Sequence, residues 1–177
     1  MSRRLALLRA VNVGGRKLPM ADLAALCEGL GWRHVKTYIQ SGNVVFEAPG
    51  GAAALEAALE SAIEARFGFA GPAMIRTAGE WRQLLAANPF GEAAEAEPNR
   101  VFLAVPKAAL RPDAVPAIAA KAGPGERVEA SGGALWFHYA DGMGASKITP
   151  TLVDRAAGSP TTARNWRTAS KLLEMLG

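Results

Sequence analysis

The stretch Val35-Lys36-Thr37-Tyr38-Ile39-Gln40-Ser41-Gly42-Asn43-Val44-Val45-Phe46-Glu47 decides the fold of the first half of the chain. Residues 35–40 and 44–47 are two short runs rich in β-branched and aromatic side chains, which predict two strands. Ser41-Gly42-Asn43 lies between the runs and has the composition of a hairpin turn, because these residues tolerate positive φ. We therefore predict an antiparallel hairpin here.

Helical patterns precede and follow this hairpin. The first begins at Pro19 and ends at Gly31, and the second ends at Gly68; the apolar residues at helical spacing are Leu23, Leu26, Cys27 and Leu30 in the first, and Leu55, Leu59, Ala62, Ile63 and Phe67 in the second. Apolar runs of strand length occupy Leu5–Val11 and Ala73–Thr77. The order strand, helix, strand, strand, helix, strand predicts a split βαβ, or ferredoxin-like, plait.

The pattern then starts again. Thr77 and Glu80 have capping-box spacing at the start of a helix. The remaining expected elements are a loop at Glu92–Pro98, a strand at Val101–Val105, a helix at Pro112–Ala122, a hairpin of Arg127–Glu129 and Leu135–Tyr139 across Ser131-Gly132-Gly133, a short helix from Thr149-Pro150 to Gly158, and a last helix that starts at Ser159-Pro160 with Trp166, Ala169, Leu173 and Leu176 inward.

We therefore predict an α+β fold of two ferredoxin-like (α-β plait) subdomains, 1–78 and 79–177. The strands Leu5–Val11 and Val101–Val105 do not alternate between polar and apolar residues, so both of their faces are expected to be covered. Two sheets with helices on one face only would achieve this by packing sheet to sheet.

Composition limits the class of protein. The chain has 177 residues, of which 50% are hydrophobic and 20% charged, as in a folded globular protein. It has no apolar run of the length that a membrane span needs, and Arg9 interrupts the apolar stretch that would serve a signal peptide. Its single cysteine forbids an internal disulfide. We expect a cytoplasmic protein with no membrane partner.

The charge is unevenly distributed along the chain. Residues 1–46 contain seven Lys or Arg against two acids, and residues 142–177 contain five against two, whereas the middle of the chain is acidic. If the ends meet, they create a positive field that attracts phosphate or carboxylate groups. Alternatively, the same charges are ordinary solvated side chains that maintain solubility.

Several motifs resemble a known family. They are Arg9-Ala10-Val11-Asn12-Val13-Gly14-Gly15, Met20 with Leu23, Thr37 to Phe46, Asn88-Pro89-Phe90, and Thr162 with Arg164-Asn165-Trp166 and Thr168. From about Leu5 to the C-terminus the chain is similar to the bacterial family catalogued as domain of unknown function 1697. The resemblance implies an α-β plait architecture with two plaits and implies no activity. Ala10 replaces a glycine that is frequent in the family.

The loop Asn12 to Lys17 separates a strand from a helix N-terminus. Gly14 and Gly15 permit positive φ, so that successive amides can point at one anion, and Arg16 and Lys17 add positive charge. The alternative is a turn that needs glycine and carries two exposed cations. The loop has neither the Gly-x-x-x-x-Gly-Lys pattern of a P-loop nor the third glycine of a dinucleotide fingerprint.

Two further segments share polar groups that suit an anion. The side chains of Ser41 and Asn43 either stabilise their turn or bind a ligand. Arg164, Arg167 and Lys171 recur at i, i+3 and i+7, which predicts a basic ridge on the last helix, with Arg164 and Asn165 in its first turns. The alternative for this ridge is a solvated helix face.

Other candidate groups are weak. Arg9 ends the first strand, and if it is buried it requires a partner or a ligand. Cys27 belongs to an apolar stripe and is expected in the core, while His34 and His138 are isolated, so we predict no metal site and no cofactor. Ser41 lacks the Gly-x-Ser-x-Gly setting of a hydrolase.

Three functions are compatible with these observations. The first is a binding module for an anionic ligand, namely a nucleic acid, a nucleotide or a phosphorylated small molecule. It uses the candidate ligand-binding residues Arg9, Asn12, Gly14, Gly15, Arg16, Lys17, Ser41, Asn43, Arg164, Asn165 and Arg167. The second is a small-molecule enzyme with its site between the two plaits. The third is a scaffold or oligomerising protein without a ligand. We favour the first.

Overall fold

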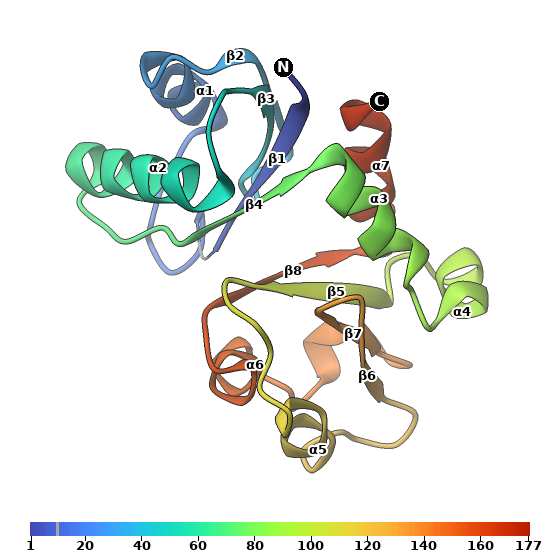
Figure 1. The fold of residues 1–177 in the computed structure, drawn as a ribbon. Helices are drawn as coiled ribbons and strands as arrows, with labels where there is room; N and C mark the ends of the chain where they lie inside the picture. The colour runs from blue at the N-terminus through green and yellow to red at the C-terminus, as the bar shows by residue number, and fades with distance from the viewer. Residues whose placement is uncertain (10) are drawn as a thin grey trace. The chain divides into compact units, whose positions relative to one another are not determined.

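The computed structural model describes residues 1–9 and 11–177. Within these residues, strands form two four-stranded antiparallel sheets, ordered β2-β3-β1-β4 and β6-β7-β5-β8, each with flanking helices (Figure 1). The chain divides into two compact units, Met1–Trp81 with Leu172–Gly177, and Arg82–Lys171. The fold class predicted from the sequence, two ferredoxin-like plaits in an α+β protein, is confirmed.

The first unit contains the predicted split βαβ arrangement. Its elements are β1 (Arg3–Leu8), α1 (Met20–Gly29), β2 (Arg33–Tyr38), β3 (Asn43–Glu47), α2 (Ala52–Phe67) and β4 (Ala73–Thr77). The strand predicted at Leu5–Val11 starts earlier and ends at Leu8; Ala10, which that prediction included, lies outside the described residues. Pro19 is the N-cap of α1, and Gly68 ends α2 with φ of +77°, a conformation that glycine adopts without a steric penalty.

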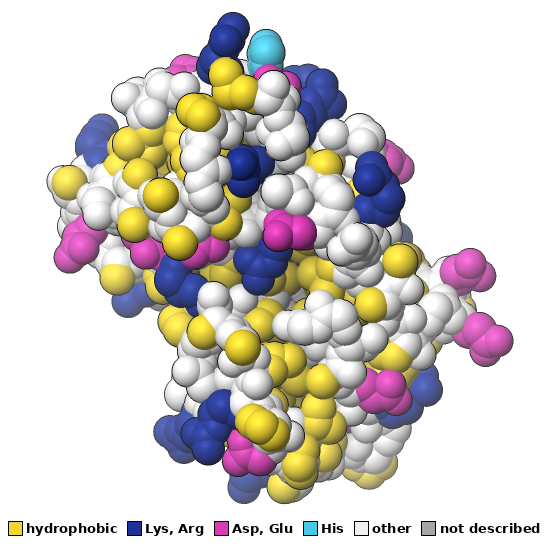
Figure 2. Space-filling model, viewed as in Figure 1, with side chains coloured by type: hydrophobic (Ala, Val, Ile, Leu, Met, Phe, Trp, Pro, Cys, Tyr) yellow, Lys and Arg dark blue, Asp and Glu magenta, His cyan; other side chains and the backbone are white. Residues whose placement is uncertain are grey.

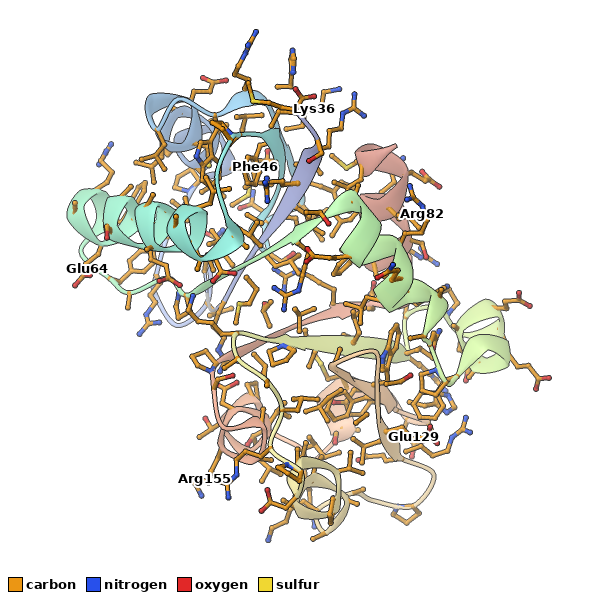
Figure 3. All side chains as sticks on the ribbon, in the orientation of Figure 1. Lys36, Phe46, Glu64, Arg82, Glu129 and Arg155 are labelled. Carbon is orange, nitrogen blue, oxygen red and sulfur yellow. The ribbon has the colours of Figure 1, made fainter. Side chains whose placement is uncertain are left out.

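The core of the first unit lies between the sheet and its two helices. Ala6 and Leu8 of β1 are buried against the helices together with Phe46 of β3, which is drawn inside the unit in Figure 3 and stacks on Trp32 at 3.9 Å between ring centroids. Leu59 contributes from α2. The larger of these side chains, Leu8, Phe46 and Leu59, each contribute roughly 1.5–3 kcal/mol to folding by their removal from water.

The other face of this sheet is buried as well. Leu5 and Leu7 of β1 alternate with Ala6 and Leu8, and all four side chains are at most 1% exposed. This confirms that the non-alternating apolar run predicts a strand covered on both faces. The packing of the two sheets face to face stays a prediction.

Strand β2 forms an irregular edge of the first sheet. Its pairing with β3 shifts register between Arg33 and Lys36, and His34 within the shift has φ of +51°. Arg33, His34 and Lys36 are exposed, and Figure 3 labels Lys36 on this strand. The edge is therefore bulged and positively charged.

The second unit repeats the topology of the first. Its plait consists of β5 (Val101–Pro106), α5 (Ala114–Ala119), β6 (Arg127–Ser131), β7 (Ala134–His138), α6 (Pro150–Ala157) and β8 (Thr161–Asn165). This unit also contains α4 (Gly91–Ala96) and the 3-10 turn η1 (Met143–Ala145), whereas α3 (Ala78–Ala86) and α7 (Trp166–Leu176) each have residues in both units. Helices α5 and α6 bury Ile118 and Ala157 against Leu135, Phe137 and Tyr139, the residues from the β7 side of the sheet.

Two expectations for the second half were wrong. The last helix starts at Trp166, not at Ser159-Pro160, because Thr161–Asn165 forms an edge strand antiparallel to β5. The segment Glu92–Pro98, predicted as a loop, contains α4. In addition, α5 is shorter than the helix predicted over Pro112–Ala122.

Local capping signals gave correct helix starts. The Thr77 hydroxyl accepts a hydrogen bond from the Glu80 amide at 3.1 Å, and the Glu80 carboxylate accepts one from the Thr77 amide at 2.7 Å, which is the predicted capping box. Thr149 caps α6 by accepting from the Leu152 amide at 3.2 Å. The domain boundaries 1–78 and 79–177 stay predictions.

Candidate functional site

The chain leaves β1 between two other connections of the first unit. The Leu8 amide donates to the Gly42 carbonyl at 2.8 Å, and the Arg9 amide donates to the Pro72 carbonyl at 2.9 Å. The β2–β3 turn and the α2–β4 connection therefore lie on either side of the β1 exit. The loop that follows β1 is thus placed next to the Ser41-Gly42-Asn43 turn, a proximity that depends on strand register.

Asn12 holds both ends of this loop. Its side-chain oxygen accepts from the Leu18 amide at 2.9 Å, and its side-chain nitrogen donates to the Leu18 carbonyl at 2.9 Å and to the Gln40 carbonyl at 2.7 Å. Asn12 itself has φ of +57°, a left-handed conformation in which asparagine is enriched. The side chain thus pairs with Leu18 as a strand residue would, and joins the loop to the β2–β3 turn.

The five residues Val13–Lys17, which we call the clasped loop, are all exposed. The Arg16 amide donates to the Val13 carbonyl at 3.1 Å and closes a tight turn. Gly14 and Gly15 have φ of +58° and +82°, and a Cβ atom at either would meet nothing within 4 Å. The amides of Gly14, Gly15 and Lys17 make no hydrogen bond with any described residue, so they remain available as donors.

The two cations of the clasped loop are also uncompensated. Within the described part of the chain, neither the Arg16 guanidinium nor the Lys17 ammonium forms an ion pair. The Arg16 guanidinium carbon lies 5.9 Å from the centroid of the Phe69 ring, a cation–π distance. The acid nearest in sequence, Asp22, lies in the first turn of α1. Free amides and two cations therefore share one short exposed segment.

Ser41 and Asn43, the predicted site residues of the hairpin turn, form hydrogen bonds within the turn. Asn43 is fully buried, and its side-chain nitrogen donates to the Tyr38 carbonyl at 2.8 Å and to the Ser41 hydroxyl at 2.9 Å. These contacts place Asn43 and Ser41 as residues that shape the turn beneath the clasped loop. Their direct contact with a ligand stays a prediction.

Gly42 is the tightest position of the turn. It has φ of +82°, and a Cβ atom there would lie 2.7 Å from Val11 Cγ2 and 2.8 Å from Leu8 Cβ. Close approach of the turn to the β1 exit therefore requires glycine. Ile39, at the start of the turn, has φ of +50°, which is rare for a β-branched residue, and its side chain is 47% exposed.

The third predicted segment belongs to the second unit, and its secondary structure differs from the expectation. Arg164 and Asn165 lie on strand β8, so the basic ridge of Arg164, Arg167 and Lys171 on one helix does not exist. Arg167 and Lys171 are exposed on α7. Asn165 instead caps α7, because its side-chain oxygen accepts from the Thr168 amide at 2.9 Å.

Arg164 is a buried cation. Its guanidinium donates to the Thr162 hydroxyl at 2.7 Å and to the Ala163 carbonyl at 2.8 Å, and the residue is 6% exposed. Burial lowers the pKa of Arg164 to about 10, which still leaves it charged at pH 7. Arg9 of the first unit is half-buried. Ligand contact by Arg9, Arg164, Asn165 and Arg167 stays a prediction.

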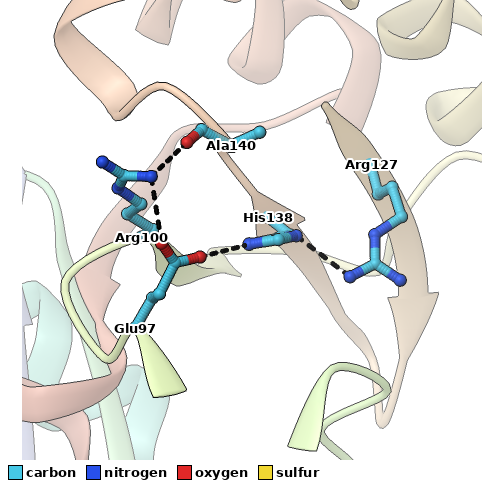
Figure 4. A network of polar contacts seen from close by, with 5 residues as sticks. All are labelled: Glu97, Arg100, Arg127, His138 and Ala140. Atoms are coloured by element: carbon cyan, nitrogen blue, oxygen red, sulfur yellow. Dashed lines mark hydrogen bonds and ion pairs between the residues drawn. The ribbon is translucent and has the colours of Figure 1, made fainter. Parts of the chain in front are cut away.

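Sequence reasoning missed a polar network in the second unit (Figure 4). His138 Nδ1 lies 3.0 Å from the Arg127 guanidinium. Because a guanidinium can only donate, Nδ1 is the acceptor and the ring proton is on Nε2. Nε2 lies 3.4 Å from the Glu97 carboxylate. Arg100 donates to Glu97 at 3.0 Å and to the Ala140 carbonyl. No local motif could reveal this arrangement, because its members come from separate segments.

The remaining chemical groups are constrained. Burial raises the pKa of the Cys27 thiol to about 12, so it stays protonated and unreactive at neutral pH. Within the described residues no three His, Cys, Asp or Glu side chains group as metal ligands would. No helix in the same residues has the length and apolar character needed to cross a membrane.

Positive charge is not gathered into one broad surface on the face that Figure 2 shows. There the Lys and Arg side chains are scattered among hydrophobic ones. On this face, recognition through charge would therefore depend on a local arrangement of cations. In the clasped loop, two cations coincide with amides that have no hydrogen bond within the described residues.

Comparison with known proteins identifies the family. Residues 1–136 match the family described as "Protein of unknown function (DUF1697)", and the chain belongs to it. The chain is similar to the conserved bacterial protein SP0830 from Streptococcus pneumoniae, with 22% sequence identity, a TM-score of 0.73 and 99% of each chain covered. At this identity the likeness shows a shared fold alone. None of the curated proteins searched matches the chain.

Proposed function

We propose that this member of the family binds a phosphate-bearing ligand, namely a nucleic acid, a nucleotide or a phosphorylated small molecule, at the clasped loop. The observation that carries the proposal is the coincidence, on five exposed residues, of the cations Arg16 and Lys17 with three amides that are unpaired among residues 1–9 and 11–177. Backbone amides beside glycines with positive φ form concave anion sites, and adjacent cations strengthen them.

The hydrogen bonds of the Asn12 side chain give the clasped loop a defined shape before a ligand binds. Asn12 fixes the distance between the loop ends, and the Ser41–Asn43 contact fixes the turn to which Asn12 is bonded. A loop that is already ordered loses less conformational entropy on binding than a mobile one. In this proposal Gly14, Gly15, Arg16 and Lys17 contact the anion, and Asn12, Ser41 and Asn43 position them.

The other predicted ligand residues extend the proposal. Arg9, Arg164, Asn165 and Arg167 are further candidates for phosphate contact, and each is tested by its own substitution in the assay below. We also propose a cytoplasmic location, because a chain with a single cysteine has no pair with which to form the internal disulfide common in oxidising compartments.

The test measures binding of fluorescent single- and double-stranded oligonucleotides, and of nucleotides by calorimetry, over a salt series. For single strands, log K falls against log salt by about 0.7 per phosphate contact. The variant Arg16→Ala with Lys17→Ala is expected to reduce that slope by about 1.4, because it removes two such contacts.

A matched control removes two exposed cations elsewhere. Lys121→Ala with Arg155→Ala makes the same change in net charge just after the end of α5 and on α6, where Figure 3 shows Arg155 projecting from α6. Equal loss of binding in both double variants would contradict a site at the clasped loop and indicate only non-specific attraction. If none of these ligands binds to the intact protein at low salt, the scaffold hypothesis is favoured instead.

A further inference from the structure

Exposed apolar side chains lie beside the cations of the clasped loop. Val13 is 55% exposed and Ile39 is 47% exposed, and they are two of four large hydrophobic side chains that are exposed within the described residues. Val13 follows Asn12 and Ile39 precedes Gln40, the two residues joined by the 2.7 Å hydrogen bond. The two apolar residues therefore belong to segments that are bonded to each other.

Two aromatic side chains lie at the end of α2 and directly after it, and one of them approaches the clasped loop. Phe67 and Phe69 are half-buried, with ring centroids 6.2 Å apart. The guanidinium of Arg16 lies 5.9 Å from the Phe69 centroid, and that of Arg66 lies 5.1 Å from the Phe67 centroid. Each ring is thus associated with an arginine and also packs against the core of the first unit. The contact with Arg16 places the Phe69 ring beside the clasped loop.

The backbone keeps Ile39 exposed at an energetic cost. A left-handed conformation is unfavourable for a β-branched residue, and such strain in native proteins concentrates at functional sites. Asparagine or glycine at this position would relieve the strain. An exposed isoleucine in this conformation contributes little to the core, so its apolar surface is available to a ligand.

These features distinguish between the ligands of the proposed function, on which this inference rests. A phosphorylated small molecule without a ring would contact the cations and amides but leave the apolar groups exposed. A duplex keeps its bases stacked inside, out of reach of the loop. A single strand presents phosphates to cations and unstacked bases to apolar and aromatic side chains.

We propose that the clasped loop binds single-stranded nucleic acid, with phosphates at Arg16 and Lys17 and with bases against the exposed side chains of Val13 and Ile39 and the exposed part of the Phe69 ring. The stacking groups are sequence-tolerant, since every base has a flat face. Binding is therefore expected to depend on the presence of bases more than on their identity.

The experiment compares two oligomers with the same number of phosphates, about twelve, by fluorescence anisotropy with the full chain at low salt. One is oligothymidine and the other carries abasic sites throughout. The proposal expects oligothymidine to bind roughly fivefold to hundredfold more tightly, the range that base stacking provides. Vesicles with anionic lipid form a third arm, and no comparable binding to them is expected.

Two variants that preserve the fold locate the contact. Val13→Ser with Ile39→Asn removes exposed apolar groups and relieves the Ile39 strain, so its thermal stability should be retained. It should bind oligothymidine at least fivefold more weakly and the abasic oligomer unchanged. Met143→Ser is the control, since Met143 is exposed to a similar extent, 48%, in the second unit. Phe69→Leu, whose unfolding is checked separately, should have the same selective effect as the double variant.

The outcomes separate this inference from the proposed function. Equal affinity for both oligomers, with loss of both in Arg16→Ala with Lys17→Ala, would overturn base contact while the anion site stands. Preference for anionic vesicles over oligothymidine would overturn it in favour of a lipid surface. Absence of binding to either oligomer and to nucleotides would overturn the proposed function as well.

Discussion

Replacing Asn12 by alanine tests whether one side chain holds the clasped loop. The substitution removes three hydrogen bonds, of which two engage the backbone of Leu18, a residue that is fully buried. Each bond contributes about 1 kcal/mol net, and buried partners left unpaired cost more. Alanine is also disfavoured at φ of +57°. The free energy of unfolding should fall by about 2–4 kcal/mol.

The assay is urea unfolding followed by circular dichroism, together with hydrogen exchange of the Leu18 amide. That amide should exchange on the order of a hundredfold faster in Asn12→Ala, because its acceptor is lost. Asn12→Gly should be less destabilised than Asn12→Ala by up to about 1 kcal/mol, since glycine accepts the left-handed conformation. Asn99→Ala, at an exposed asparagine, is the control and should change stability by less than about 0.5 kcal/mol.

The reasoning is refuted if Asn12→Ala unfolds at the same urea concentration as the intact protein and Leu18 exchange is unchanged. In that case the clasped loop would be held by contacts other than those of Asn12. A loss of ligand binding without loss of stability would instead assign Asn12 to direct contact with the ligand.

The remaining predictions concern stability and reactivity. Gly42→Ala should lower the free energy of unfolding in urea by about 2–4 kcal/mol, because the added methyl group collides with two side chains and the residue has a left-handed φ. Gly14→Ala, which has open space around it, should lower the free energy of unfolding by about 1 kcal/mol. Equal losses of stability in the two variants would contradict this prediction. Cys27 should react with thiol reagents at pH 8 only as fast as the chain unfolds, and labelling at the rate of an open thiol would exclude its burial. Because the pKa of Cys27 is raised, the unfolded chain loses the Cys27 proton above about pH 9, whereas the folded chain keeps it to about pH 12. The free energy of unfolding should therefore fall as the pH rises from 9 to 12. Asp154→Ala should cost about 1.5–3 kcal/mol, because the Asp154 carboxylate accepts from both the amide and the hydroxyl of Thr161, at 2.9 and 2.7 Å; Asp154→Asn, which keeps an acceptor, should cost less in the same urea titration.

The sequence predicts the first unit well because its signals are local. Gly68 ends α2 in the left-handed conformation that glycine favours, and Thr77 and Glu80 form the expected capping box. The predicted hairpin also occurs, although its turn is residues 39–42, because β2 ends at Tyr38 and Asn43 already pairs with it in β3. Each signal involves residues within a few positions of one another, so no knowledge of tertiary structure is required.

Strand β8 could not be predicted in the same way. Ser159-Pro160 imitates a helix start, but the residue that caps α7 is Asn165, six positions after Ser159. The strand between them is five residues long and is stabilised by pairing with β5, in which Arg164 lies opposite Leu103. Such distant pairing leaves little trace in a short sequence window, although the β-branched pair Thr161-Thr162 was a signal for a strand.

The candidate site was partly predictable. Glycine content and adjacent cations located the segment around Gly14 and Arg16 correctly as an exposed loop before α1. Its attachment to the β2–β3 turn through Asn12 and Gln40 depends on strand register, which the sequence leaves open. The flanking position of Phe69 likewise depends on the tertiary fold.

The bulged edge of the first sheet has a consequence for self-association. A regular edge strand offers a row of backbone donors and acceptors onto which another chain can add, and proteins obstruct this with bulges and lysines. The kink at His34 spoils the spacing that an incoming strand would need, and Arg33 and Lys36 repel the identical edge of a second molecule. The β2 edge therefore disfavours the addition of a strand from a second copy, which is the step that leads to fibrils.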